Sequence, residues 1–146
     1  MAQRTPVPPG SAAEVSCAAL AEAVACEMDV VAAWLFGSVA LGTSGPLSDV
    51  DVALALSRDA DRDAVCGRVA DRLARRLHTD RIDLVSFDEA STDLRYRIVR
   101  DGHRVLCRDA AACERLTADA VMQYLDFQPV REQAFRVMRD AITKGK

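Results

Sequence analysis

A glycine–serine pair is followed ten residues later by two aspartates in this 146-residue sequence. Gly37 and Ser38 come directly after one apolar run, and Asp49 and Asp51 open the next. Backbone N–H groups at the start of a helical turn attract phosphate, and a glycine lets the phosphate approach the chain. Two carboxylates two positions apart on a strand project from one face, about 6.6 Å apart along the chain. Residues 37–51 therefore predict a phosphate cradle beside paired acidic side chains.

A third carboxylate, Asp83, stands between apolar Ile82 and Leu84 in a later segment. Like charges 4 Å apart repel by roughly 4 kcal/mol at an effective dielectric constant of 20. Residues 37–56 contain no lysine or arginine, so the cluster needs protonation, a basic partner from elsewhere or a divalent cation. Mg²⁺ shared with substrate phosphates is the natural cation. A phosphate cradle beside such an ion predicts nucleotidyl or phosphoryl transfer.

The elements that must position these side chains follow from apolar periodicity. Ser11 with Glu14 three residues later predicts a capping box that opens the first helix. Pro129 is expected to break the last helical pattern in two. The expected strands span residues 30–36, 49–56, 82–87 and 103–107, and the expected helices span 11–28, 60–78, 94–101, 110–126 and 130–142.

This pattern predicts an α+β fold, a small mixed sheet with helices on one face and a helical C-terminus. We expect residues 1–10 to be a disordered tail, because they are rich in proline. Residues 11–146 are then a single domain, with C-terminal helices from about residue 110.

Composition excludes several classes of protein. Half the residues are hydrophobic, 28% are charged and the net charge is −3, as in an ordinary globular domain rather than a disordered or collagen-like chain. The acidic balance argues against direct nucleic-acid binding, and no apolar run could span a membrane. Five cysteines without a C-x-x-C pair predict free thiols in the cytoplasm.

The spacing Gly37-Ser38, ten residues, Asp49-Val-Asp51 resembles the G-S-x10-D-x-D signature of minimal nucleotidyltransferases in the DNA polymerase β-like superfamily. Asp83 with its apolar neighbours, and the pattern over residues 94–106, resemble the MntA-type antitoxins that accompany HEPN toxins. The sequence departs from that family in residues 86–91, where an Asn- and Pro-containing stretch is usual, and at residues 106–107, where Leu-Cys replaces Leu-Tyr.

The resemblance implies a nucleotidyltransferase (polymerase β-like) fold and specific roles. Asp49, Asp51 and Asp83 would hold two Mg²⁺ ions, Gly37 and Ser38 would bind the terminal phosphates of ATP, and Asp83 would help to deprotonate the attacking hydroxyl. The implied activity is protein adenylylation by the antitoxin of a type VII toxin–antitoxin module. AMP would pass from ATP to a tyrosine of a cognate HEPN (HepT-type) RNase toxin, with which the chain would form a hetero-oligomer.

Two other functions stay open. The fold could neutralise a toxin by binding alone, without catalysis, or it could be a small-molecule nucleotidyltransferase that modifies an antibiotic. Taken singly, Asp49 could cap a turn and Asp83 could be a charge at a strand edge. The arginine runs in residues 72–76 and 95–100 fit solvated helix faces as well as a docking surface.

Two further patterns point elsewhere but fit poorly. Arg97 with His103, and Arg72 with His78, have the R-x4–6-H spacing of HEPN ribonucleases, but Gly102 interrupts the helix that the first pair would need. Residues 37–43 resemble a Walker A loop, but they lack its lysine.

Overall fold

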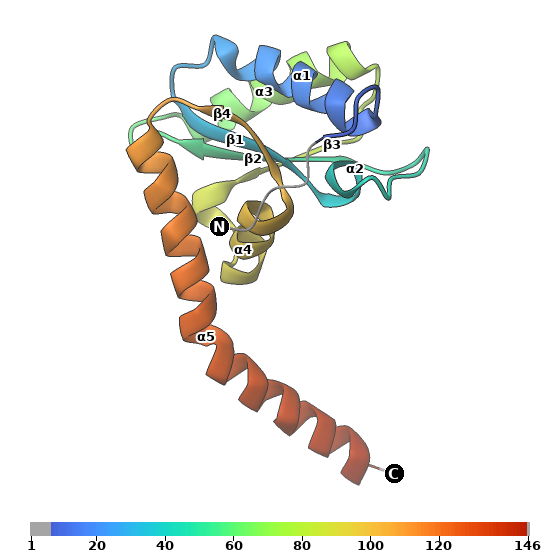
Figure 1. Ribbon diagram of the computed structural model, residues 1–146, viewed down its shortest axis with the longest axis vertical. Coiled ribbons are helices and arrows are strands. Elements are labelled where there is room, and N and C mark those ends of the chain that lie inside the picture. The colour runs from blue at the N-terminus through green and yellow to red at the C-terminus, as the bar shows by residue number, and fades with distance from the viewer. Residues whose placement is uncertain (1–6, 146) are drawn as a thin grey trace.

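The computed structural model describes residues 7–145 and contains a four-stranded mixed sheet with the strand order β3-β2-β1-β4 (Figure 1). β1 pairs antiparallel with both β2 and β4, whereas β2 and β3 run parallel. The elements in chain order are α1 (Ala12–Ala25), β1 (Val30–Phe36), α2 (Gly37–Leu41), β2 (Val50–Leu56), α3 (Arg62–Leu77), β3 (Ile82–Ser86), the 3₁₀ turn η1 (Phe87–Glu89), α4 (Thr92–Asp101), β4 (His103–Cys107) and α5 (Ala110–Lys144).

The α+β architecture confirms the expected fold, and α1 and α3 cover one face of the sheet (Figure 1). The expectation placed helices on one face, whereas the structure also covers the opposite face, with η1, α4 and the first half of α5. β1 is apolar at every position because it lies in the middle of the sheet with both faces covered. Leu35 points into the α1–α3 side, and Trp34 stacks on Phe87 on the other, with ring centroids 4.8 Å apart.

Short polar side chains begin the helices as the sequence predicts. The Ser11 hydroxyl accepts a hydrogen bond from the Glu14 amide at 3.1 Å, and the Glu14 carboxylate accepts one from the Gly10 amide. The capping box is therefore confirmed, with its return contact one residue earlier than usual. Asp61, Ser91 and Asp109 cap α3, α4 and α5 in the same way.

Glu27 is a buried acid that ties α1 to α3. Its exposed fraction is 6%, and its carboxylate accepts hydrogen bonds from Arg68 at 2.9 and 3.0 Å and from Arg72 at 2.7 Å. Hydrogen bonding to Arg68 is the main reason that the pKa of Glu27 falls to about 2. Arg76 pairs with Glu22 on the same side, so Arg68, Arg72 and Arg76 of α3 all form ion pairs with α1 or the loop that follows it.

The prediction that Pro129 divides the last helical segment is wrong, because α5 is one helix from Ala110 to Lys144. Proline removes the amide that would bond to the Leu125 carbonyl, and Figure 1 shows α5 changing direction near its middle instead of ending. Contacts on both sides of the proline hold the helix together. Tyr124 stacks on Tyr96 of α4, and the Arg131 guanidinium donates to the Tyr124 carbonyl at 2.5 Å.

Part of the expected tail falls outside the described residues, which begin at Val7. Val7 packs against the α1–α3 side of the core, and the Pro8 carbonyl accepts from the Ser11 amide at 3.3 Å. The division into a tail and a single domain stays a prediction. All five cysteines are free thiols, as expected. None of the helices in residues 7–145 is long and apolar enough to cross a membrane.

Candidate active site

The turn after β1 brings the glycine–serine pair against the acidic strand. Gly37 starts α2 directly after Phe36, and Phe36 pairs with Asp51 across the β1–β2 ladder. Gly37 has a φ of +76°, which L side chains rarely adopt. A Cβ at this position would lie 3.0 Å from Asp51 Cγ and closer still to Oδ2. The glycine is therefore required both by its backbone conformation and by the carboxylate packed against it.

The three predicted carboxylates gather at one end of the sheet. Asp51 and Asp83 are the second residues of β2 and β3 and are paired in the parallel ladder, so they project from the same face. Asp49 precedes β2 by one residue and is exposed, as is Asp83. The face that carries Asp51 also carries Ala53, Trp34 and the α4 side of the core.

Mutual repulsion perturbs the central carboxylate. The pKa of Asp51 is raised, first by partial burial and then by the negative charges of Asp83 and Asp49. The structure thus brings together the acids that the sequence singled out, and it raises the free energy of the ionised form of Asp51 relative to that of a solvated aspartate. A bound cation would reverse this effect, because it would favour the ionised carboxylate.

A cavity of about 300 Å³ lies beside these acids, lined by Asp49, Asp80, Arg81, Ile82 and Asp83. Two of its charged residues, Asp80 and Arg81, were missed in the sequence because they lie in a short loop without a motif. The Arg81 guanidinium donates to the Leu47 carbonyl at 3.1 Å, which ties the loop before β3 to the loop before β2. Arg81 thereby holds the two loops that present the acids.

The donor set suits a divalent cation that also binds a nucleotide. Carboxylate oxygens are the ligands that Mg²⁺ prefers, and in phosphoryl-transfer sites it takes one or two of them together with substrate phosphates. Within the described part of the chain, no three acidic, histidine or cysteine side chains lie close enough together to hold a metal ion by themselves. The arrangement fits an ion whose remaining ligands come from a triphosphate and water.

His103 has a structural contact next to the site. It begins β4, and its Nε2 lies 2.9 Å from the carbonyl oxygen of Ala40 in α2. It therefore holds the glycine–serine turn against the sheet, a role that no sequence pattern indicates. His78 ends α3 with a φ of +53°. Neither histidine lies inside a helix that also carries its arginine, so the HEPN ribonuclease interpretation is wrong.

Comparison with known proteins identifies a family whose matching region includes this site. The sequence profile of the family described as "Polymerase beta, Nucleotidyltransferase" matches residues 19–111, a range that includes the glycine–serine turn and all three acids. The chain therefore belongs to the polymerase beta nucleotidyltransferase family. Among curated proteins, no relative of this sequence is found.

Solved structures share the fold. One is a toxin–antitoxin with AMP-PNP, at 24% identity over 87% of this chain and 98% of the other, with a TM-score of 0.67. A mutant of the toxin–antitoxin MntA–HpeT has 25% identity over 81% and 93%, with a TM-score of 0.66. A tri-AMPylated Shewanella oneidensis HEPN toxin in complex with MNT antitoxin has 20% identity over 87% and 98%, with a TM-score of 0.67.

Proposed function

We propose that this chain is a Mg²⁺-dependent protein adenylyltransferase and the antitoxin of a type VII toxin–antitoxin module. It transfers AMP from ATP to a tyrosine of a cognate HEPN (HepT-type) RNase toxin and releases pyrophosphate. The observation that supports this most directly is the packing of Asp51 between Gly37 and Asp83 at the sheet end. The solved neighbours supply the type of acceptor, since one is crystallised with AMP-PNP and another contains an AMPylated toxin.

The proposed roles follow from where the side chains lie. Asp49, Asp51 and Asp83 would hold the ions, and the backbone at Gly37 and Ser38 would orient the terminal phosphates of ATP. Bound there, Mg²⁺ would stabilise negative charge on the attacking and departing oxygens. Asp83 is the more exposed acid of the β2–β3 pair, and we assign it to accept the proton of the incoming hydroxyl.

The residues of the site would align the acceptor hydroxyl with the α-phosphorus of ATP for an in-line displacement. The hydroxyl oxygen of the acceptor tyrosine forms a bond to the α-phosphorus of ATP, and the bond from that phosphorus to the oxygen bridging to the β-phosphate breaks. The electron pair of the broken bond leaves with pyrophosphate. His103 and Arg81 are positioning residues. His103 holds α2 in place, and Arg81 holds the loop before β2.

The experiment is adenylyl transfer to the co-produced toxin, followed by intact-mass analysis of both proteins. The wild-type chain with ATP and Mg²⁺ is expected to add the mass of one or more adenylyl groups to the toxin, on tyrosine. The Asp49→Asn/Asp51→Asn variant is expected to add none, while Asp71→Asn, an exposed acid of α3, serves as the matched control. Undiminished transfer by the double variant would refute the assignment.

Neutralisation by binding alone is the second candidate. The solved neighbours support it, because they are complexes of a toxin with its antitoxin. Toxin rescue in cells separates the two functions. Full rescue by the double variant, with no mass gain on the toxin, would favour binding, and failed rescue by a folded double variant would favour catalysis.

A further inference from the structure

One mostly apolar seam, interrupted by Gln123 and ending at Lys144, runs the length of α5, and only its first half is covered. Positions three and four residues apart alternate along the helix, which is the heptad spacing of helices that pack side by side. The early seam residues Cys113, Leu116 and Ala120 pack on the α4 side of the sheet. In order, the seam consists of Cys113, Leu116, Ala120, Gln123, Phe127, Val130, Ala134, Val137, Ala141 and Lys144.

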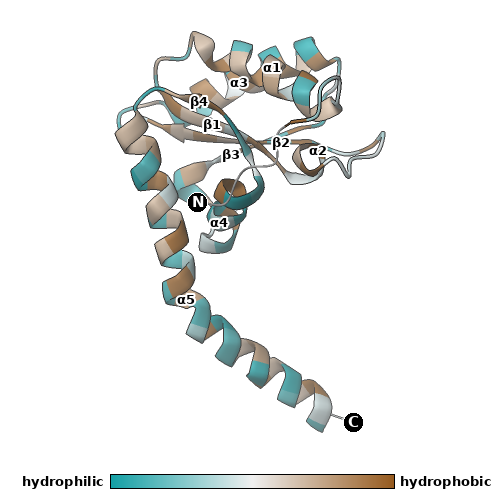
Figure 2. Ribbon diagram, viewed as in Figure 1, coloured by the Kyte–Doolittle hydropathy of each residue, from teal (hydrophilic) through white to brown (hydrophobic). Residues whose placement is uncertain are grey.

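The second half of the seam has nothing packed on it. Phe127 is 52% exposed, Val130 59% and Val137 62%, and Ala134 and Ala141 are exposed as well. Figure 1 shows this part of α5 extending away from the sheet, and Figure 2 shows hydrophobic and hydrophilic patches alternating along it. The same spacing that packs the helix on its own domain thus continues from Phe127 to Ala141, about four turns, with no partner among residues 7–145.

The projecting half is held in place rather than free to fold back. Tyr124 stacks on Tyr96 with centroids 3.8 Å apart, and Arg131 lies over the Tyr124 ring at 3.8 Å while pairing with Asp93 at 3.3 Å. These contacts fix the helix to α4 on one side. Val130 and Val137 lie on a different side of the helix, so the anchor does not cover them.

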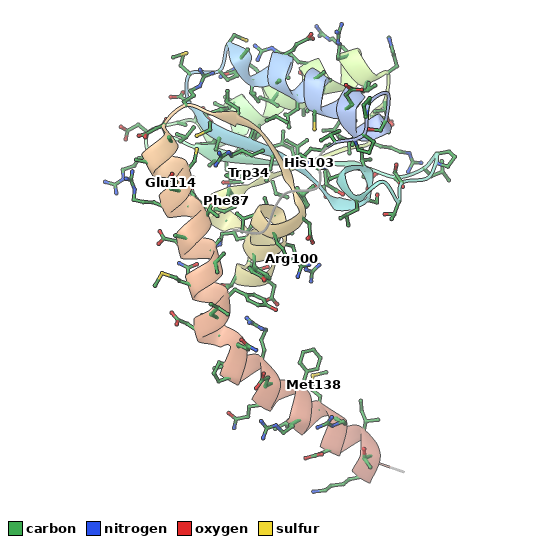
Figure 3. All side chains as sticks on the ribbon, viewed as in Figure 1. Trp34, Phe87, Arg100, His103, Glu114 and Met138 are labelled. Atoms are coloured by element: carbon green, nitrogen blue, oxygen red, sulfur yellow. The ribbon has the colours of Figure 1, made fainter. Side chains whose placement is uncertain are left out.

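The uncovered surface is large for a single helix. At about 150–250 Å² for a fully exposed large side chain, the six exposed large residues of the projecting half together expose on the order of 600 Å². Monomeric proteins rarely leave a larger apolar patch open, and a standard interface buries about 800 Å² on each partner. Phe127, Val130 and Val137 belong to the seam, and Phe135, Met138 and Ile142 lie on the neighbouring side of the helix, where Met138 is labelled in Figure 3.

We propose that this face binds a second copy of the chain, with the two projecting halves of α5 packed antiparallel. The seam alternates large and small residues, so an antiparallel pair places Val130 opposite Ala141 of the second copy and Val137 opposite Ala134. Facing large and small side chains fill the layers evenly, whereas a parallel pair would stack alanine on alanine and leave voids. The seam is therefore complementary to itself in one orientation.

Charges at the two ends favour the same orientation. Asp126 lies beside the start of the open seam, and Lys144 lies at its end. Antiparallel packing brings Asp126 of each copy near Lys144 of the other copy, so the twofold symmetry creates two equivalent ion pairs. Parallel packing would place like charges together at both ends.

The first test is the mass of the purified full chain in solution, by light scattering and analytical ultracentrifugation. We expect a dimer of twice 15.8 kDa at tens of micromolar. Val137→Lys should weaken the dimer about a hundredfold, since each copy brings one unpaired charge into the seam at about tenfold each. Thr143→Lys, on the opposite side of the helix, should leave the dimer intact, and at concentrations low enough for wild type to be monomeric the melting temperature of both variants should match wild type.

A charge exchange tests the orientation. Asp126→Lys and Lys144→Asp should each weaken the dimer several-fold, and the double variant should restore it. A wild-type chain that stays monomeric, a dimer that survives Val137→Lys, or a double variant that fails to recover would each overturn the proposal. A monomer in which Val137→Lys abolishes co-purification with the toxin would assign the face to the toxin instead. None of these readouts depends on adenylyl transfer, so the proposed function stands or fails separately.

Discussion

Neutralising Asp51 should stabilise the fold while it removes the chemistry. Asp51 is the carboxylate on which burial and two neighbouring negative charges converge. Asp51→Asn keeps the shape of the side chain and its contact with Gly37 but deletes the charge that Asp83 and Asp49 oppose. Residues held at functional sites often cost stability in this way, so replacing them stabilises the protein.

The magnitude follows from the paired positions of Asp51 and Asp83 on neighbouring strands. Strands lie about 4.8 Å apart, and like charges at about 5 Å repel by roughly 1–3 kcal/mol for effective dielectric constants between bulk water and 20. Because Asp83 is exposed, solvent screening places the gain near the low end, at about 1 kcal/mol. For a domain of this size, that corresponds to a rise in melting temperature of about 3 °C.

The gain should depend on pH with a defined sign. A carboxyl whose pKa is raised by folding destabilises the folded state only while it is ionised. The stability difference between Asp51→Asn and wild type should therefore be full at neutral pH. It should shrink as the pH falls through the raised pKa and vanish below the unfolded value of about 3.9.

The assay is thermal unfolding at pH 7 and at stepwise lower pH, with and without MgCl₂. Wild type should gain stability with Mg²⁺, and Asp51→Asn should lose most of that response because a ligand is missing. Asp71→Asn on α3 should differ from wild type by less than about 0.5 kcal/mol under every condition. If Asp51→Asn melts at or below the wild-type temperature at pH 7, with the same Mg²⁺ response, the carboxylates do not converge as described.

Two further substitutions test the surroundings. Gly37→Ala should lower the free energy of unfolding by about 2 kcal/mol, because alanine disfavours the positive φ and its Cβ displaces the Asp51 carboxylate. Chemical denaturation measures this cost. The variant should also lose adenylyl transfer, and full activity would contradict the proposed phosphate-binding role of the turn. Glu27→Gln should cost about 2 kcal/mol at pH 7, discounted for the half-exposed Arg68. Because the pKa of Glu27 is lowered by folding, that cost should disappear as the pH falls from about 4.5 towards 2, which urea unfolding at pH 7 and pH 3 would reveal.

The strand alternation could be predicted from the sequence because it depends on local spacing. Val50, Val52 and Leu54 share one face and Asp51 and Ala53 the other, as two-residue periodicity requires. Helix starts at serine and aspartate caps were equally accessible, because the cap bonds to an amide only a few residues away. The alternation of side chains cannot predict which strand lies beside β2. The pairing of Asp51 with Asp83 depends on that order.

The errors and omissions have tertiary causes. Pro129 was expected to end a helix, but stacking of Tyr124 on α4 and the contacts of Arg131 hold the segments on both sides in one helix. Glu27 has no motif, and its importance comes from arginines more than forty residues away. Arg81 acts on the loop before β2 through a carbonyl oxygen, which no side-chain pattern records.

The topology separates the carboxylates from the open seam of α5. β1 ends where Asp51 and Asp83 begin their strands, and His103 pairs with Leu35 at that same end. β4 then runs antiparallel to β1, so it delivers the chain to the opposite end of the sheet, where Cys107 pairs with Ala32 and α5 begins three residues later. A charge placed in the second half of α5 therefore has no contact through which to alter the pKa of Asp51. We therefore expect single substitutions in the second half of α5 to abolish dimerisation without affecting adenylyl transfer. Single substitutions of the carboxylates should abolish transfer without affecting dimerisation.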